Sequence, residues 1–507
     1  MRAVKIKPGP DEFGDFQTPV ALAAAACRFL GDRGIVPAAV VEPTCGLGSF
    51  VLAALDQFPG ATCLGIEINP AYVESLRASL AAVGDNGRAN VLQQSFFDVD
   101  WRETFRGLPE PILVLGNPPW VTNAALGAVG STNLPKKTNF QGYTGLDALT
   151  GKSNFDISEW MLIRLLDLLA DRRAWLAILC KTAVARKALL HAWKSGIAVD
   201  WAEMRAIDAS THFGAAVDAC LFVCALSPGG RSQDCGVYPD FEARTPTSVI
   251  GYGDGHLVAD VPAYRRGKHL VGNSAVYQWR SGVKHDCSKV MELRREGPNF
   301  RNGLGELIEL EADFVFPMLK SSELANGNVH APERWMLVPQ QAVGEDTRGI
   351  RLRAPKTWQY LIDHMEALDR RGSSIYKNRP RFSVFGVGDY TFAPWKVAIS
   401  GFYKRLQFNV VGSSDGKPIV LDDTGYFVAC RCEDEARYVA SLLNSETARE
   451  FFSAFIFWDA KRLITVDLLR RLDLRALARE IGSEVELDQL LGKVREPRNR
   501  QLDLFDR

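Results

Sequence analysis

Apolar and polar residues occur in alternating blocks over the first 230 residues of the 507-residue chain. Short, continuous apolar runs typical of buried strands alternate with stretches that have apolar residues at helical spacing. Strands are predicted at residues 38–43, 62–68, 90–97, 111–117, 174–181 and 218–226, and helices at residues 21–30, 50–58 and 70–83. This alternation predicts an α/β fold with a doubly wound, mostly parallel sheet, whose ligand lies outside the carboxyl ends of the strands.

The pattern changes after this region. Residues 227–248 are rich in Gly, Pro, Ser and Asp, which favours a linker, and the sequence beyond them has no regular period. We therefore expect a first domain at residues 1–230, and a linker with the start of the C-terminal region at 231–310. A mixed α+β domain at 311–485 and a charged tail at 486–507 complete the expected organisation.

Composition narrows the class of protein. Hydrophobic residues make up 47% and charged residues 24%, as in soluble globular proteins. No apolar run reaches the roughly 18 residues of a transmembrane helix, and the first residues lack the apolar core of a secretory signal. The ten cysteines are scattered and lack metal-site spacing, so we expect reduced thiols in a cytoplasmic protein without a metal.

The first chemical feature is a glycine turn. Gly46 and Gly48 follow a predicted strand and precede a helix, and Glu67 ends the next strand. Glycines let the backbone approach a ligand, and a carboxylate at the position of Glu67 accepts hydrogen bonds from ribose hydroxyls. Glu42 would repel a diphosphate but not a cofactor with an amino group or sulfonium. Alternatively, this is an ordinary turn flanked by solvated acids.

The second feature is Asn117-Pro118-Pro119-Trp120, directly after the strand at 111–117. The prolines hold the chain extended and remove two N–H donors. The Asn117 side-chain oxygen and the Pro118 carbonyl then accept both hydrogens of an exocyclic amino group. The nitrogen lone pair stays out of the ring and becomes nucleophilic, while Trp120 offers a flat face to a planar base. Alternatively, Trp120 is a core residue beyond a proline-closed strand.

Together these features resemble a known family. Phe16-Gln17-Thr18-Pro19, EPTCGLG, GIEINP and NPPW arrive in the order found in gamma-group S-adenosylmethionine-dependent adenine-N6 DNA methyltransferases of restriction–modification systems. The resemblance covers about residues 13–226 and extends loosely to a C-terminal target-recognition region. It implies a Rossmann-like class I methyltransferase domain, then a target-recognition domain. It also implies methylation of a flipped-out adenine in double-stranded DNA, with S-adenosyl-L-methionine as cofactor.

The resemblance also implies roles for single residues. The cofactor is expected to contact Thr18, Glu42, Thr44, Gly46, Glu67 and Asn117, and its adenine Ser95, Phe96 or Asp98. At the position that contacts the cofactor's adenine, the family usually has Asp followed by Phe. Either Ser95 replaces this Asp, or Asp98 makes the contact after a local shift of the chain.

The catalytic residues implied are Asn117, Pro118, Pro119 and Trp120. Phe213 is the best match for an aromatic that stacks on the opposite face of the flipped base from Trp120, although an ordinary core Phe fits its sequence context too. The absence of a Pro-Cys dipeptide argues against C5-cytosine chemistry.

The chain's zero net charge hides a basic stretch. Residues 351–405 contain 11 Lys and Arg, 4 Asp and Glu and 10 aromatic residues. Basic and aromatic side chains together suit contacts with DNA phosphates and bases, and Lys377, Arg379, Arg381 and Lys396 are the candidates. A solvated charged face of a sheet is the alternative.

The sequence leads to two hypotheses about protein partners, a sliding clamp and a separate endonuclease or other defence component. In the tail, Gln501, Leu502, Leu504 and Phe505 resemble a bacterial sliding-clamp-binding motif, although such residues also fold back onto a domain. With no nuclease motif evident, we expect a separate endonuclease or another defence component.

Other functions remain open at this stage. The Asn-Pro-Pro-aromatic tetrapeptide also suits a glutamine-N5 protein methyltransferase or an RNA adenine methyltransferase. A non-catalytic DNA-specificity subunit is a third possibility. The long C-terminal half, with its basic, aromatic-rich stretch, argues against a small protein methyltransferase, and the intact tetrapeptide argues against a degenerate domain.

Overall fold

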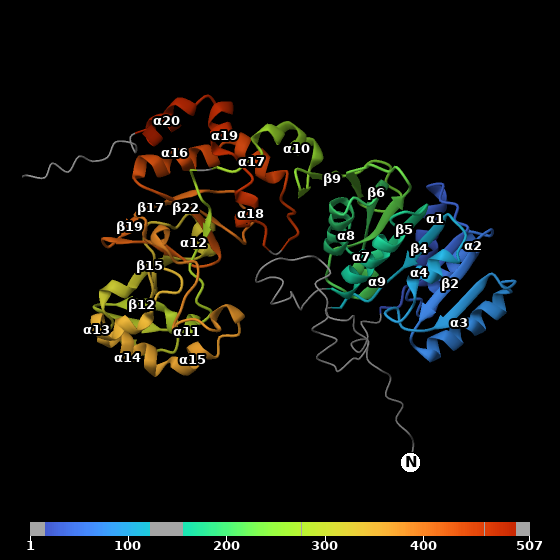
Figure 1. The fold of residues 1–507 in the computed structure, drawn as a ribbon, viewed down its shortest axis with the longest axis horizontal. Coiled ribbons are helices and arrows are strands. Elements are labelled where there is room, and N and C mark those ends of the chain that lie inside the picture. The colour runs from blue at the N-terminus through green and yellow to red at the C-terminus, as the bar shows by residue number, and fades with distance from the viewer. Residues whose placement is uncertain (1–15, 122–155, 275, 461, 493–507) are drawn as a thin grey trace, which may run out of the picture. The chain divides into compact units, whose positions relative to one another are not determined.

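The chain folds into two compact units, which divide after Val261. The computed structural model describes residues 16–121, 156–274, 276–460 and 462–492 (Figure 1). The division lies later in the chain than the boundary at residue 230 that the sequence predicts.

The first unit is an alternation of helices and strands, as the hydrophobic pattern predicts. In chain order its described elements are α1 (Val20–Asp32), β1 (Ala39–Glu42), α2 (Ser49–Gln57), β2 (Thr62–Glu67), α3 (Pro70–Val83), β3 (Ala89–Gln93), α4 (Trp101–Arg106), β4 (Ile112–Gly116), α7 (Ile157–Leu169), β5 (Ala174–Lys181), α8 (Thr182–Lys194), β6 (Val199–Ile207), α9 (Ala209–Phe213), β7 (Ala219–Leu226), β8 (Asp234–Tyr238), β9 (Ser248–Gly253) and β10 (His256–Val258).

Its strands form one sheet in the order β10-β9-β8-β6-β7-β5-β4-β1-β2-β3. From β3 to β5 every neighbouring pair is parallel, and β7 runs antiparallel between β5 and β6. The reversal of strand order beside β1 places the carboxyl ends of β1 and β4 next to each other, where ligands of such sheets bind. This confirms the doubly wound α/β class.

The edge of this sheet differs from the sequence prediction. Residues 234–258, expected to belong to a linker, form β8, β9 and β10. These strands are short and only partly buried, so they lack the continuous apolar runs that mark the central strands.

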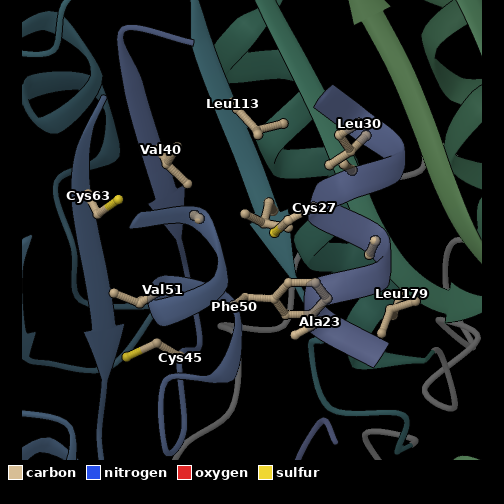
Figure 2. Close-up of a cluster of buried hydrophobic side chains, with 14 of the residues drawn as sticks. Ala23, Cys27, Leu30, Val40, Cys45, Phe50, Val51, Cys63, Leu113 and Leu179 are labelled. Atoms are coloured by element: carbon tan, nitrogen blue, oxygen red, sulfur yellow. The ribbon is translucent and has the colours of Figure 1, made fainter. Parts of the chain in front are cut away.

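A buried cluster fixes the helices against one face of the sheet. Figure 2 shows Cys27 and Leu30 of α1, Phe50 of α2, and the strand residues Val40 and Leu113 within it. Phe50 is fully buried. Because α2 begins directly after the glycine turn, this packing holds the turn at the carboxyl end of β1.

The second unit is mixed α+β, as expected, and begins within α10. Its described elements are α10 (Val261–Gly267), η1 (Lys268–Leu270), β11 (Arg280–Ser281), α11 (Ser288–Met291), β12 (Glu292–Glu296), β13 (Asn299–Asn302), β14 (Leu307–Ile308), η2 (Ala312–Phe314), β15 (Val315–Leu319), α12 (Ser321–Asn326), β16 (Arg334–Leu337), η3 (Thr347–Gly349), α13 (Ile350–Arg353), α14 (Pro355–Asp363), α15 (Met365–Asp369), η4 (Ser374–Tyr376), η5 (Asp389–Phe392), β17 (Trp395–Ser400), β18 (Asn409–Val411), β19 (Ser413–Ser414), β20 (Lys417–Pro418), β21 (Val420–Leu421), β22 (Gly425–Cys430), α16 (Glu433–Leu443), α17 (Glu446–Ser453), α18 (Val466–Leu469), α19 (Leu474–Glu480) and α20 (Glu484–Gly492).

Two larger sheets organise this unit. One has four strands in the order β11-β22-β17-β18, and the other has six in the order β14-β13-β12-β16-β15-β21. Across the described part of the chain, every helix is too short or too polar to cross a membrane.

Candidate active site

The glycine turn has the conformation that its residues predict. Gly46 and Gly48 have φ angles of +52° and +86°, which side-chain-bearing residues adopt only with strain. A Cβ on Gly48 would also lie 2.1 Å from Cδ1 of Leu76. Both the backbone angle and the packing of α3 therefore require glycine here.

Glu67 braces this turn from the end of β2. One carboxylate oxygen accepts the N–H of Gly46 at 2.8 Å, and the other accepts the N–H of Asn69 at 2.7 Å. The expected ribose-binding carboxylate is thus held in place by backbone amides and lies directly beside the expected amino-acid-binding turn.

The N-terminal segment packs onto the same turn. The side-chain oxygen of Gln17 accepts the N–H of Leu47 at 3.0 Å, and the hydroxyl of Ser49 donates to the Thr18 carbonyl at 2.7 Å. Within this segment the resemblance implies a role for Thr18 only. Phe16 and Gln17 belong to the same tetrapeptide, and this neighbouring position is the sequence signal that points to them.

Glu42 lies at the end of β1 and is only 4% exposed. Burial raises its pKa well above the usual range, and the nearby carboxylate of Glu67 adds to this increase. A hydrogen bond from the Val51 N–H, 3.0 Å long, partly opposes the shift. A buried carboxyl of this kind favours a cationic ligand group, because a positive charge beside it stabilises the ionised form.

Asn117 joins the tetrapeptide to the N-terminal segment. Its side-chain nitrogen donates to the Phe16 carbonyl at 3.1 Å, which leaves the side-chain oxygen as the acceptor. Among the residues that the structure describes, that buried oxygen has no hydrogen-bond partner, and the same holds for the hydroxyl of Thr44. Buried polar atoms of native proteins are normally paired, so two orphans on the expected cofactor and target-base residues fit a missing ligand. The residues present therefore fit S-adenosylmethionine.

Trp120, Phe213 and Phe16 form one aromatic cluster. The ring centroids of Trp120 and Phe213 are 5.1 Å apart with an interplanar angle of 67°, and Phe16 lies 5.9 Å from Trp120. Trp120 is 5% exposed, and its indole N–H donates to the Leu179 carbonyl at 3.3 Å. The structure brings together the two predicted stacking residues. They pack edge to face, so stacking a base between them requires a ring to move.

The region of the expected adenine contact forms a tight turn after β3. The Asp98 N–H donates to the Ser95 carbonyl at 3.0 Å. Ser95 and Phe96 are buried, whereas the side chain of Asp98 is exposed. Phe96 packs 4.9 Å from the ring of Trp101, which occupies one side of its ring. Burial near the strand end favours Ser95 over Asp98 as the polar contact.

The basic candidates of the second unit have different environments. Lys377 and Arg379 are exposed and form no ion pair within the described residues. Arg381 is also exposed, but its guanidinium pairs with the carboxylate of Asp369. The prediction for Lys396 is wrong, because this residue of β17 is only 1% exposed.

Lys396 lies in the core of the second unit. Its ammonium group donates to the carbonyls of Ala393 and Ile419, at 2.5 and 2.9 Å. Burial lowers its pKa to about 7. A lysine without solvent access cannot reach a phosphate, so its part in DNA binding is withdrawn.

The proposed clamp-binding residues lie outside the described part of the chain. Gln501, Leu502, Leu504 and Phe505 follow the last described residue, and their role stays a prediction.

No family model matches the chain, but similar proteins and similar solved structures are found. The chain is 45% identical to the type II methyltransferase M.NspV of Nostoc sp., over 93% of this chain and 98% of that protein. It is 32% identical to the type II methyltransferase M.XamI of Xanthomonas campestris, over 22% and 21% of the two chains. Among solved structures, the type IIL restriction–modification enzyme MmeI in complex with DNA has a similar fold. Its TM-score is 0.52 at 12% identity, covering 94% of this chain and 68% of that one. With this near full-length relative and a site that fits the cofactor, the chain belongs to the type II methyltransferases, the S-adenosylmethionine-dependent DNA-modifying enzymes of restriction–modification systems.

Proposed function

We propose that this protein methylates N6 of adenine at specific sites in double-stranded DNA, after the target base leaves the helix. In this proposal it is the modification enzyme of a restriction–modification system and works alongside a separate endonuclease. Base extrusion is part of the proposal because an adenine stacked in a duplex cannot place its amino group inside a buried site.

The observation that carries the proposal is that the buried side-chain oxygen of Asn117 has no hydrogen-bond partner within the described part of the chain. An unpaired buried acceptor costs about 1–3 kcal/mol, so its retention calls for a ligand that supplies a donor. Because the amide nitrogen is already bonded to the Phe16 carbonyl, this oxygen is positioned as an acceptor. An exocyclic amino group is a donor that suits it.

The chemistry follows from the tetrapeptide. Asn117 and the Pro118 carbonyl accept the two hydrogens of the amino group, which keeps the nitrogen lone pair available for attack. Neither oxygen needs to remove a proton before the attack. S-adenosylmethionine, when bound, supplies an electrophilic methyl group on a sulfonium sulfur. Glu42 provides the negative charge that a cationic amino-acid moiety requires, and Glu67, beside the glycine turn, would accept hydrogen bonds from the ribose hydroxyls.

Aromatic side chains offset part of the cost of extruding the base. Trp120 and Phe213 pack against each other and against Phe16, whose carbonyl holds Asn117. Base–aromatic stacking contributes about 1–3 kcal/mol per base. For a base to stack on both rings, the edge-to-face pair has to open. Phe213 is half-buried at the end of α9 and is followed by Gly214, so we propose that Phe213 is the ring that moves.

We propose that Lys377 and Arg379 contact DNA from the segment at residues 377–382, which we call the anchored loop. The loop base is fixed because the hydroxyl of Thr347 donates to the Arg381 carbonyl at 2.5 Å, and the Phe382 ring is fully buried. Phe382 has a φ of +67°, a strained value for a bulky residue, so its burial holds the backbone in an otherwise unfavourable state. Such anchoring presents the exposed cations in a defined position.

The test is methyl transfer from S-adenosylmethionine labelled in the methyl group. The purified protein is incubated separately with duplex DNA, RNA and protein extract, and labelled DNA is digested to nucleosides. We expect the label to be found in duplex DNA as N6-methyl-2′-deoxyadenosine. We expect no label with the variant Asn117→Ala. Label in RNA or protein alone would favour the rival enzymes, and DNA binding without label would favour a specificity subunit.

A further inference from the structure

The catalytic tetrapeptide lies where the sheet stops holding it. The parallel pairing of β4 with β5 ends at Gly116 and Ile178. β5 continues for three more residues, Leu179 to Lys181, which pair with β7 on its other side. Residues 117–120 therefore run beside the end of β5 without ladder bonds to it.

The two prolines of the tetrapeptide further limit its hydrogen bonding to neighbouring strands. Pro118 and Pro119 have no N–H, so the segment offers few backbone donors to any neighbour. Its position must come from side chains instead. Two contacts tie it to β5: the Trp120 indole donates to the Leu179 carbonyl at 3.3 Å, and the ammonium group of Lys181 donates to the Trp120 carbonyl at 2.9 Å.

Lys181 is itself held in place. Its ammonium group pairs with Asp156 at 2.7 Å, and the Asp156 side chain is only 10% exposed. The other carboxylate oxygen of Asp156 accepts the N–H and hydroxyl of Ser158, at 3.1 and 2.5 Å, at the start of α7. The Ile157 N–H also donates, at 2.9 Å, to the carbonyl of Val121, the residue that follows Trp120. One ammonium group thus joins the strand, the tetrapeptide and α7.

Helix stability does not explain a lysine at this position. Lys181 occupies the N-cap of α8 and makes no capping hydrogen bond. Ser, Thr, Asp and Asn are the stabilising residues there, and a cation at a helix N-terminus opposes the helix dipole. A residue that breaks a local rule and makes specific contacts elsewhere is a candidate for function.

We propose that Lys181 is a positioning residue for methyl transfer, which fixes the Trp120 carbonyl and through it the acceptor oxygens of Asn117 and Pro118. The inference rests on the proposed function, because it assigns Lys181 a task only if the tetrapeptide grips the target amino group. Lys181 acts through Trp120 and touches neither cofactor nor base.

The experiment compares Lys181→Met, Lys181→Arg and Lys187→Met with the wild type. Lys187 is the matched control, because its ion pair with Glu159, 2.5 Å long, also reaches α7 but does not contact the tetrapeptide. We measure single-turnover methylation, affinity for S-adenosylmethionine and melting temperature. A duplex with 2-aminopurine at the adenine methylated by the wild type reports base extrusion by fluorescence.

Misplacement of reacting groups typically costs tenfold or more in rate, so we expect Lys181→Met to lower the single-turnover rate at least about tenfold. Cofactor affinity should stay within about twofold of the wild type, because Asn117 is the one expected cofactor residue that lies in the tetrapeptide held by Lys181. The 2-aminopurine signal should fall as well. Lys181→Arg should recover part of the rate, since a guanidinium can donate to both acceptors, and Lys187→Met should behave as the wild type.

The inference is overturned if Lys181→Met keeps the wild-type rate, or if Lys187→Met loses as much. It is also overturned if the rate falls only as far as the folded fraction or cofactor affinity does, since that outcome means a purely structural role. Failure of the proposed function appears separately, as a wild type that forms no N6-methyladenine.

Discussion

Glu42 is the residue at which stability and function are most clearly opposed. It is buried, its pKa is raised by desolvation, and it faces the further negative charge of Glu67. A group whose pKa is raised on folding contributes stability below its unfolded pKa, and that contribution is lost as pH rises through the folded pKa. Near neutral pH the cofactor-free protein therefore carries an unfavourable carboxyl, which a bound cation relieves.

We expect Glu42→Gln to weaken S-adenosylmethionine binding by about tenfold or more, which is about 1.4 kcal/mol, while the melting temperature of the cofactor-free protein stays equal or rises. Wild-type affinity should increase as pH rises through the raised pKa of Glu42 and its carboxyl ionises, and that of the variant should change less. Titration calorimetry at a series of pH values measures both. Equal affinities for the two proteins would contradict the role assigned to Glu42.

Lys396 shows where residue-level prediction fails. Its position in a basic, aromatic-rich stretch suggested a phosphate contact, but strand β17 is buried along nearly its whole length. A sequence reveals charge but not which sheet lies over a strand. Aliphatic stems allow lysines to enter cores when carbonyls are available, as those of Ala393 and Ile419 are here.

The pKa of about 7 for Lys396 predicts a pH dependence of stability. Above about pH 7 the unfolded chain holds a proton on this lysine that the folded chain has lost, so folding stability rises with pH up to the unfolded value near 10.4. We expect Lys396→Met to remove this rise, as measured by urea unfolding at several pH values. DNA affinity should be unchanged, and a clear loss of affinity without a change in stability would restore the original assignment.

At the scale of elements, the central strands of the first unit could be predicted from the sequence, whereas the individual strands of the second unit could not. The central strands of the first unit are continuous apolar runs closed by glycine or proline, as in the strand that ends at Gly116. Strands β8 to β10 were missed because an edge of a sheet tolerates polar and glycine-rich sequence. The second unit is built from strands as short as two residues, which leave no period to detect.

The site was predictable in its motifs but not in its contacts. The turn at Gly46 and the tetrapeptide at Asn117 carry their chemistry in adjacent residues. Lys181 comes from a different strand end, and only the tertiary structure brings it to the Trp120 carbonyl. Phe16 likewise contributes a backbone carbonyl, for which the sequence holds no signature.

The anchored loop of the second unit carries a prediction about DNA binding. Lys377→Ala and Arg379→Ala should each weaken binding to any duplex and lower the slope of log affinity against log salt by about 1, as expected for one lost phosphate contact. Arg381→Ala should change the salt slope less, because its guanidinium is paired with Asp369. Fluorescence anisotropy at several salt concentrations distinguishes these outcomes. An Arg381 variant with the largest change would reverse the assignment.

At the scale of the whole molecule, we propose that the first unit carries out the chemistry and the second recognises the DNA. Every residue proposed to bind the cofactor or to take part in catalysis lies before Val261, and the anchored loop lies after it. The zero net charge of the chain is compatible with DNA binding because residues 351–405 carry a local excess of seven positive charges.

This division predicts the behaviour of a fragment. Residues 1–261, produced alone, should bind S-adenosylmethionine with an affinity close to that of the full chain, because every residue proposed to contact the cofactor lies within the first unit. The fragment should lose site-specific DNA methylation, because the recognition surface is absent. Calorimetry and a labelled-DNA assay test the two halves of this prediction. Methylation of the same sites by the fragment would contradict the assignment of recognition to the second unit.

The most direct test of the central claim is nucleoside analysis by mass spectrometry of DNA from cells that produce the wild-type protein or Asn117→Ala. The proposed function predicts N6-methyladenine in wild-type cells, confined to one sequence context, and its absence with the variant. A methylated cytosine in its place, or equal N6-methyladenine with the variant, would contradict it.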